Sequence, residues 1–183
     1  DRSTSPRACQ LSADTWHALG DVDRASAALR NHAYSHQIAE SAGRMLTGVL
    51  ALQGVTGNMM RDPGWHMIAA GRYVERSLQL AHLLRSTALV RRGIDVDREV
   101  LSSVLTASES VVTHRRRYRG YVRLGGVLDL LVVDRENPRS IAFALDRLQE
   151  HLAAMPESTG ATRPERLLDD LLDYASGGTV FLE

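Results

Sequence analysis

Residues 62–92, DPGWHMIAAGRYVERSLQLAHLLRSTALVRR, decide the fold class of this chain. Asp62 and Pro63 form a typical helix start, in which a polar cap precedes proline at the first helical position. Apolar side chains then recur at helical spacing, namely Ile68, Val74, Leu78, Ala81 and Leu84. The pattern predicts an amphipathic helix that reaches about Arg92, with Gly93 as a left-handed cap at its end.

Similar helix start and end signals recur along the rest of the chain. Further helices are predicted to begin at Ser5–Pro6, Asn31, Asp97, Leu124, Asn137–Pro138 and the Thr162–Glu165 capping box. The run from Asn31 to about Met60 contains four glycines, which require either close helix packing or a break near Gly54. The segment from Asp97 reaches Arg119 with a break near residues 108–110.

Helical patterns therefore cover almost the whole chain. The segment from Asn137 runs through Met155, and only residues 176–181 resemble a strand. We predict an all-α helical bundle of about six to eight helices, forming one domain over residues 1–183 with a tail at 176–183.

The composition excludes several classes of function. The 183 residues include 22 basic and 22 acidic side chains, so the net charge gives no reason to expect nucleic acid or an anionic membrane as a partner. All basic residues are arginine, which excludes Schiff-base chemistry and a P-loop lysine. The single cysteine, Cys9, excludes an internal disulfide. No signal-like or membrane-spanning stretch is present, so we expect a cytoplasmic protein that uses no cofactor.

The first candidate site lies within the quoted helix. Arg72, Glu75 and Arg76 are three and four residues apart, so their side chains share one helical face, which His82 joins two turns later. A glutamate between two guanidinium groups stays ionised and suits an electrostatic clamp or a metal ligand better than a general acid. Glu75 is also the one candidate catalytic residue. The alternative is an ordinary ion-pair network on the helix surface.

The second candidate is the arginine-rich stretch from His114 to Arg123. Its candidate binding residues are Arg115, Arg116, Arg117 and Tyr118, with Asp129 nearby. Guanidinium groups bind phosphate and carboxylate oxygens in a bidentate manner, so the stretch predicts an anion site. The alternative is a helix end whose arginines complement the helix dipole and pair with acidic residues such as Asp129 and Asp134.

The third candidate is the loop at residues 134–140. Asn137 and Arg139 precede a predicted helix start, where free amides and a guanidinium group together favour an anion. The alternative is that Asn137 only caps the helix. Histidines give no convincing metal site, because the helically spaced pair His32 and His36 lacks a following carboxylate.

These stretches also carry a resemblance to a known family. Residues 61–65, 71–80, 118–120, 128–131 and 136–143, in this order, resemble the bacterial alpha-E family, and residues 2–16 look like its middle segment. The resemblance implies that this chain is the C-terminal portion of a longer helical domain. It also implies a circularly permuted ATP-grasp protein, fused or neighbouring, as a partner, and thus a context of amide-bond or peptide-tag chemistry.

Three functions follow as hypotheses. The first is an accessory domain of an ATP-grasp-linked amide- or peptide-ligase system that binds an acidic peptide or the partner enzyme through arginine-rich faces. The second is an enzyme domain in which Glu75 and the flanking arginines process a peptide or amide product. The third is a structural module that forms a homo-oligomer.

Overall fold

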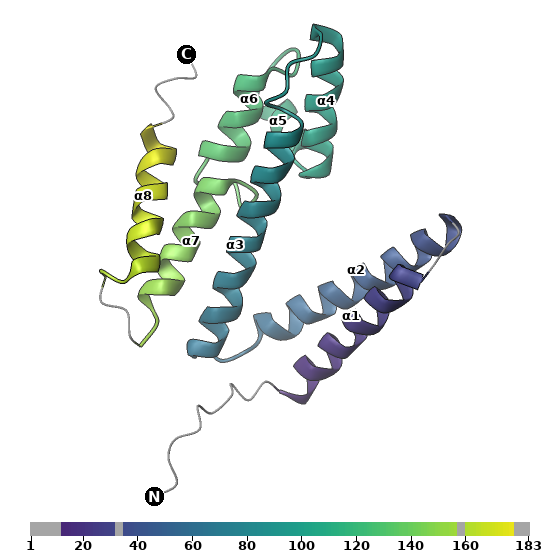
Figure 1. Cartoon of the computed structure of the whole chain (residues 1–183), viewed down its shortest axis with the longest axis vertical. Helices are drawn as coiled ribbons and strands as arrows, with labels where there is room; N and C mark the ends of the chain where they lie inside the picture. Colours follow the sequence, from purple (N-terminus) through teal and green to yellow (C-terminus); the bar gives the residue numbers. More distant parts are fainter. Residues whose placement is uncertain (1–11, 32–34, 157–159, 178–183) are drawn as a thin grey trace, which may run out of the picture. The chain divides into compact units, whose positions relative to one another are not determined.

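The computed structural model describes residues 12–31, 35–156 and 160–177. Within these ranges it contains eight α-helices, one π-helical turn and no strand (Figure 1). The predicted all-α class is thus confirmed. The chain forms two compact units, Asp1–Trp65 and His66–Glu183. None of the described helices is long and apolar enough to cross a membrane.

The first unit contains the helix pair α1 (Ala13–Asn31) and α2 (Ser35–Gly57). Gly48 of α2 lies directly against α1, where an added Cβ would lie 3.1 Å from Cγ2 of Val22. α2 continues through Gly54, so the break considered there is absent, and of the four glycines only Gly48 lies in close helix packing. The predicted start at Asn31 was wrong, because this residue ends α1, and the predicted start at Ser5–Pro6 lies outside the described residues.

α3 (Pro63–Ser86) begins where the sequence predicted. A carboxylate oxygen of Asp62 accepts a hydrogen bond from the Trp65 amide at 2.8 Å, which satisfies one of the free donors at the helix start. The predicted end was wrong. α3 stops at Ser86, and the Arg92 guanidinium donates to the carbonyl groups of Thr87 and Val90 in the following turn.

The next helices are α4 (Ile94–Ala107) and α5 (Val111–Arg117). Gly93 precedes α4 with an extended φ of −131°, so it begins this helix and does not end α3 as predicted. Asp97 lies inside the first turn of α4, and its carboxylate accepts the Arg92 amide at 3.1 Å. The predicted break near residues 108–110 is confirmed, and Glu109 takes a positive φ of 48° there.

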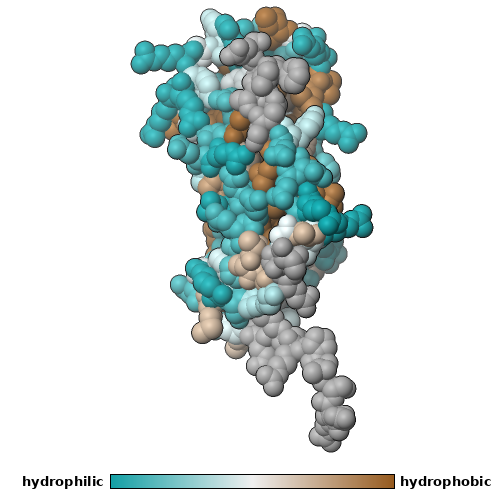
Figure 2. Space-filling model, turned by 90° about the vertical axis from the view of Figure 1, so that its left-hand side faces the viewer, coloured by the Kyte–Doolittle hydropathy of each residue, from teal (hydrophilic) through white to brown (hydrophobic). Residues whose placement is uncertain are grey.

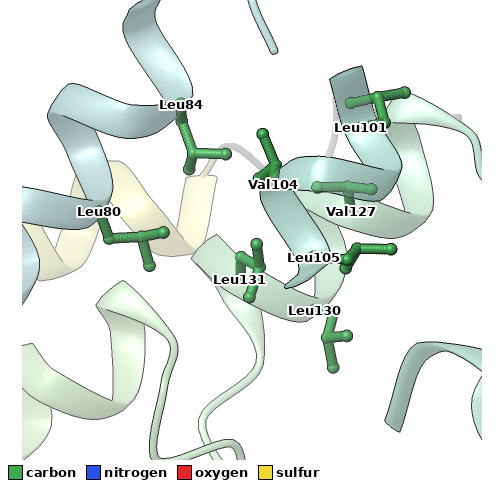
Figure 3. Close-up of a cluster of buried hydrophobic side chains, with 8 residues drawn as sticks. All are labelled: Leu80, Leu84, Leu101, Val104, Leu105, Val127, Leu130 and Leu131. Carbon is green, nitrogen blue, oxygen red and sulfur yellow. The ribbon is translucent and has the colours of Figure 1, made fainter. Parts of the chain in front are cut away.

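α6 (Leu124–Leu128) and the π-helical turn η1 (Asp129–Val133) form the centre of the second unit. Their apolar sequence predicted burial on most sides, and Val127 is fully buried. Figure 3 shows how side chains from α3 and α4 surround this segment, in a core of Leu80, Leu84, Leu101, Val104, Leu105, Val127, Leu130 and Leu131. This core fixes α3 and α4 against the chain that leads into α7.

α7 (Ile141–Ala153) and α8 (Arg163–Gly177) pack through a smaller cluster of Leu145, Leu168 and Leu172. The Thr162–Glu165 capping box is confirmed, with the Thr162 amide donating to the Glu165 carboxylate at 2.8 Å. Ser176 and Gly177 are helical, and the rest of the strand-like stretch lies outside the described residues. Figure 2 views the side on which α8 lies in Figure 1, and shows a largely hydrophilic surface with small hydrophobic areas.

Candidate functional site

α3 presents the three residues of the first candidate site, but they do not act as one group. Arg72 and Glu75 are exposed, and a Glu75 carboxylate oxygen accepts a hydrogen bond from the Gln79 amide at 2.7 Å. Neither Arg72 nor Glu75 forms an ion pair with any described residue. The expected clamp of Glu75 between two arginines is therefore not formed, because Arg76 turns toward another part of the chain.

Arg76 reaches the loop before α7. Its guanidinium donates to the Pro138 carbonyl at 2.9 Å and lies 5.8 Å from the centre of the Tyr73 ring. Pro138 is 62 residues further along the chain, so this contact depends on the packing of α3 in the core. It brings Arg76 next to Arg139, which the sequence assigned to a separate candidate site.

Arg76 and Arg139 line one hollow of about 600 Å³, which we call the Arg76–Arg139 hollow. Three parts of the second unit contribute to it: α3, the turn between α4 and α5, and the loop before α7. The side chains lining it are Arg76, Gln79, Leu80, Leu83, Ala107, Ser108, Glu109, Pro138 and Arg139. The hollow thus combines guanidinium groups with an apolar wall from α3.

Arg139 is already paired with an acidic side chain in this hollow. Its guanidinium lies 2.6 Å from the carboxylate of Glu109, and it also approaches the Ser108 carbonyl at 3.4 Å. The Glu109 side chain is 73% exposed, so water screens the pair and its contribution to stability is about 0–1 kcal/mol. A carboxylate from another molecule can therefore compete with Glu109 at little cost to the fold.

Asn137 holds the loop that carries Arg139. Its side-chain amide donates to the Leu130 carbonyl at 2.8 Å, and its oxygen accepts the Arg139 amide at 3.1 Å. The prediction that Asn137 caps the helix was wrong, because Ser140 is the N-cap of α7 and its hydroxyl accepts the Phe143 amide at 3.0 Å. Asn137 is thus a positioning residue for this loop.

Some residues of the arginine-rich stretch form contacts within the fold, and others are exposed and unpaired among the described residues. Arg117 pairs with Asp134, and the Tyr118 hydroxyl donates to the carboxylate of Asp129. Desolvation, and then the hydrogen bond to Asp129, raise the pKa of Tyr118 to about 12, so its phenol remains a donor well into the alkaline range. Arg115 and Arg116 are exposed and pair with no described residue.

The sequence did not identify Glu109 or Gln79 as candidates, and it did not indicate the buried environment of His114. Glu109 gave no signal, because only the fold places it against Arg139. Gln79 follows Glu75 by one helical turn, and this spacing does indicate their hydrogen bond. His114 looked like one of several scattered histidines, yet it is only 2% exposed and its Nε2 has no hydrogen-bond partner among the residues that the structure describes.

The described residues contain no group of three or more His, Cys, Asp or Glu side chains that could hold a metal ion. Of the predicted histidine pair, His32 and the side chain of His36 lie outside the part that the structure describes. Glu75 remains a candidate catalytic residue only by prediction. The arrangement that the structure does provide is suited to binding carboxylates.

Comparisons with known proteins agree with the helical fold. The model of the alpha-E family, described as a predicted alpha-helical domain with a conserved ER motif, matches residues 8–179. Uncharacterized proteins of Mycobacterium tuberculosis and Mycobacterium bovis are 38% identical over 168 residues, which cover 88% of this chain and 19% of theirs. The chain thus spans about one fifth of the length of these relatives. No solved structure matches it.

Proposed function

Because the chain belongs to the alpha-E family of helical domains, we propose that it is an accessory domain of an ATP-grasp-linked amide- or peptide-ligase system. In this proposal the domain binds carboxylate groups of an acidic peptide in the Arg76–Arg139 hollow. The observation that carries it is the convergence of Arg76 and Arg139, 63 positions apart in sequence, on one hollow with an apolar wall.

The chemistry of the hollow favours a carboxylate ligand. Guanidinium groups present paired donors that match the two oxygens of a carboxylate. Glu109 gives an internal example, since its carboxylate already lies 2.6 Å from the Arg139 guanidinium. Leu80 and Leu83 supply apolar area on which the aliphatic part of a glutamate side chain can pack.

The assignment of the partner rests on family context. The resemblance implies a circularly permuted ATP-grasp protein that is fused to the helical domain or encoded beside it. In the mycobacterial relatives the matched segment is only 19% of the chain, so the helical domain there is one part of a longer protein. This supports a domain that works beside other domains.

Peptide binding can be tested with an oligoglutamate peptide and the full chain. We expect Arg76→Gln and Arg139→Gln each to weaken binding roughly tenfold, because each removes one charge-assisted contact. Thermal stability should change by no more than about 1 kcal/mol for Arg139→Gln, whose side chain is exposed, and by about 1 kcal/mol for Arg76→Gln, whose half-buried side chain also loses its hydrogen bond to Pro138. Isothermal titration calorimetry measures the affinities.

Two further variants make the test specific. Arg72→Gln is the matched control, because Arg72 lies on the same helix but outside the hollow. Glu109→Gln should tighten peptide binding, because it removes the internal carboxylate that competes for Arg139. Equal affinity of the wild type and Arg139→Gln, or an equal loss with Arg72→Gln, would contradict the proposal.

The two other functions remain predictions. An enzyme domain requires that Glu75→Gln abolish turnover of a peptide or amide product without affecting folding. A structural module requires a stable homo-oligomer, which light scattering measures. Among the described residues, Glu75 forms a side-chain hydrogen bond only with Gln79, and this bond does not favour the enzyme hypothesis over binding.

A further inference from the structure

A second hollow, of about 460 Å³, lies where the chain passes from α5 to α6. Arg117, Arg119 and Arg123 line it, and none of the described residues that line it carries a carboxylate. We call it the Arg119–Arg123 hollow. Gly120 has a φ of 105°, a left-handed conformation that favours glycine, and this turn lets the arginines on both of its sides face the same hollow.

The hollow carries uncompensated positive charge. Arg117 is neutralised by Asp134, whose side chain is only 9% exposed. The side chains of Arg119 and Arg123 are exposed and form no hydrogen bond or ion pair with any described residue. Two guanidinium groups therefore remain available to a ligand, and their mutual repulsion falls when an anion lies between them.

His114 lies in the wall of this hollow, and within the described part of the chain no group forms a hydrogen bond with its Nε2. The ring centres of His114 and Tyr118 are 4.9 Å apart, and an added Cβ on Gly126 would lie 3.3 Å from Nε2. The nitrogen is thus enclosed beneath the surface, where an anion in the hollow acts on it through the electric field. The pKa of the His114 imidazole should therefore change when an anion occupies the hollow.

A larger hollow adjoins the first and offers room for an organic group. It has a volume of about 610 Å³ and shares Tyr121 and Arg123 with the Arg119–Arg123 hollow. Val100, Leu101 and Leu124 give it an apolar wall. A ligand that places an anion between the arginines can extend past Arg123 into this second space.

We propose that the Arg119–Arg123 hollow binds a phosphate group, carried by an ester whose apolar part lies in the adjoining hollow. A carboxylate would neutralise only one of the two free guanidinium groups, whereas a phosphate carries a charge of about −1.5 to −2 near neutral pH. Its oxygens can also accept from both guanidinium groups at once. This site is separate from the Arg76–Arg139 hollow and does not depend on peptide binding there.

The test is a titration of the full chain with inorganic phosphate and with phenyl phosphate at constant ionic strength. We expect Arg119→Gln and Arg123→Gln each to weaken binding roughly tenfold, as expected for loss of a charge-assisted hydrogen bond. Arg115→Gln is the matched control, because this exposed arginine of the same stretch does not line the hollow. Tighter binding of phenyl phosphate than of phosphate supports an ester, and equal binding of the two would overturn the assignment of an apolar part to the adjoining hollow.

An independent readout comes from His114. Burial lowers the pKa of His114, and a bound dianion should raise it again, because nearby negative charge favours the imidazolium. NMR titration of the imidazole should therefore show a higher pKa with phosphate in the wild type and no change in Arg119→Gln/Arg123→Gln. Binding that is equally weakened by Arg115→Gln, that acetate reproduces, or that is absent from the wild type would overturn the proposal.

Discussion

Tyr118 illustrates how single residues in the arginine-rich stretch serve the fold. Its hydroxyl donates to Asp129 in the buried π-helical turn, and desolvation with this bond raises its pKa from 10.0 to about 12. Between these two values the folded protein binds more protons than the unfolded chain. The contribution of Tyr118 to the free energy of unfolding is therefore fully present below pH 10, and it is lost as the pH rises toward about 12.

This gives a prediction for alkaline unfolding. In the wild type, the free energy of unfolding from urea titrations should fall between pH 10 and about 12. Tyr118→Phe should lack this component of the fall, and it should be less stable near neutral pH by about 1–2 kcal/mol because Asp129 loses its donor. Parallel pH curves for the two proteins would show that Tyr118 does not cause the fall.

At the scale of helices, glycine has different roles within α2. Gly48 faces α1, and an added Cβ would lie 3.1 Å from Val22, whereas an added Cβ at Gly43 would meet nothing within 4 Å. We expect Gly43→Ala to stabilise the chain by up to about 1 kcal/mol through helix propensity. Gly48→Ala should lose this gain or destabilise the chain, and thermal unfolding measures both. A similar gain for the two variants would contradict the close packing of α1 and α2.

Sequence patterns predicted the helices better than their boundaries. The start of α3, the break near residues 108–110 and the Thr162–Glu165 capping box are local features, and each is confirmed. Gly93 and Asn137 were misassigned because glycine and asparagine occur at either end of helices and in turns. Their roles depend on backbone angles and on contacts such as that of Asn137 with Leu130, which are set by tertiary packing.

At the scale of the whole molecule, the two units differ in the size and apolar area of their buried side chains. The second unit has a core of leucine and valine side chains that includes Leu130 and Leu131, both fully buried. Among the described residues of the first unit, the buried side chains are small, namely Thr15, Ala18, Ser41 and Thr56. Less apolar burial gives less stabilisation, so the first unit should open more readily.

Hydrogen exchange tests this difference. Amides of α4 and of the segment formed by α6 and η1 should exchange most slowly, and those of α1 and α2 at least about tenfold faster, because local opening follows local stability. Mass spectrometry of peptic peptides resolves these segments. Equal protection of both units would show that the chain opens as one cooperative body.

The candidate sites also show what only the whole fold reveals. Sequence spacing identified Arg76 and Arg139 individually, each within its own motif. It placed Arg76 with Glu75 because both lie on one helical face, whereas the fold brings Arg76 to Pro138 and leaves Glu75 with Gln79. Residues that meet through packing across about 60 positions leave no periodic signal in one sequence.

The most direct test of peptide binding in the Arg76–Arg139 hollow is an NMR titration that observes the arginine side-chain nitrogens during addition of oligoglutamate peptide. If the peptide binds in this hollow, the guanidinium signals of Arg76 and Arg139 shift together and saturate at one affinity, while the signal of Arg72 stays in place. Unchanged signals of Arg76 and Arg139 in the presence of bound peptide, or equal shifts for all three arginines, would contradict binding in this hollow.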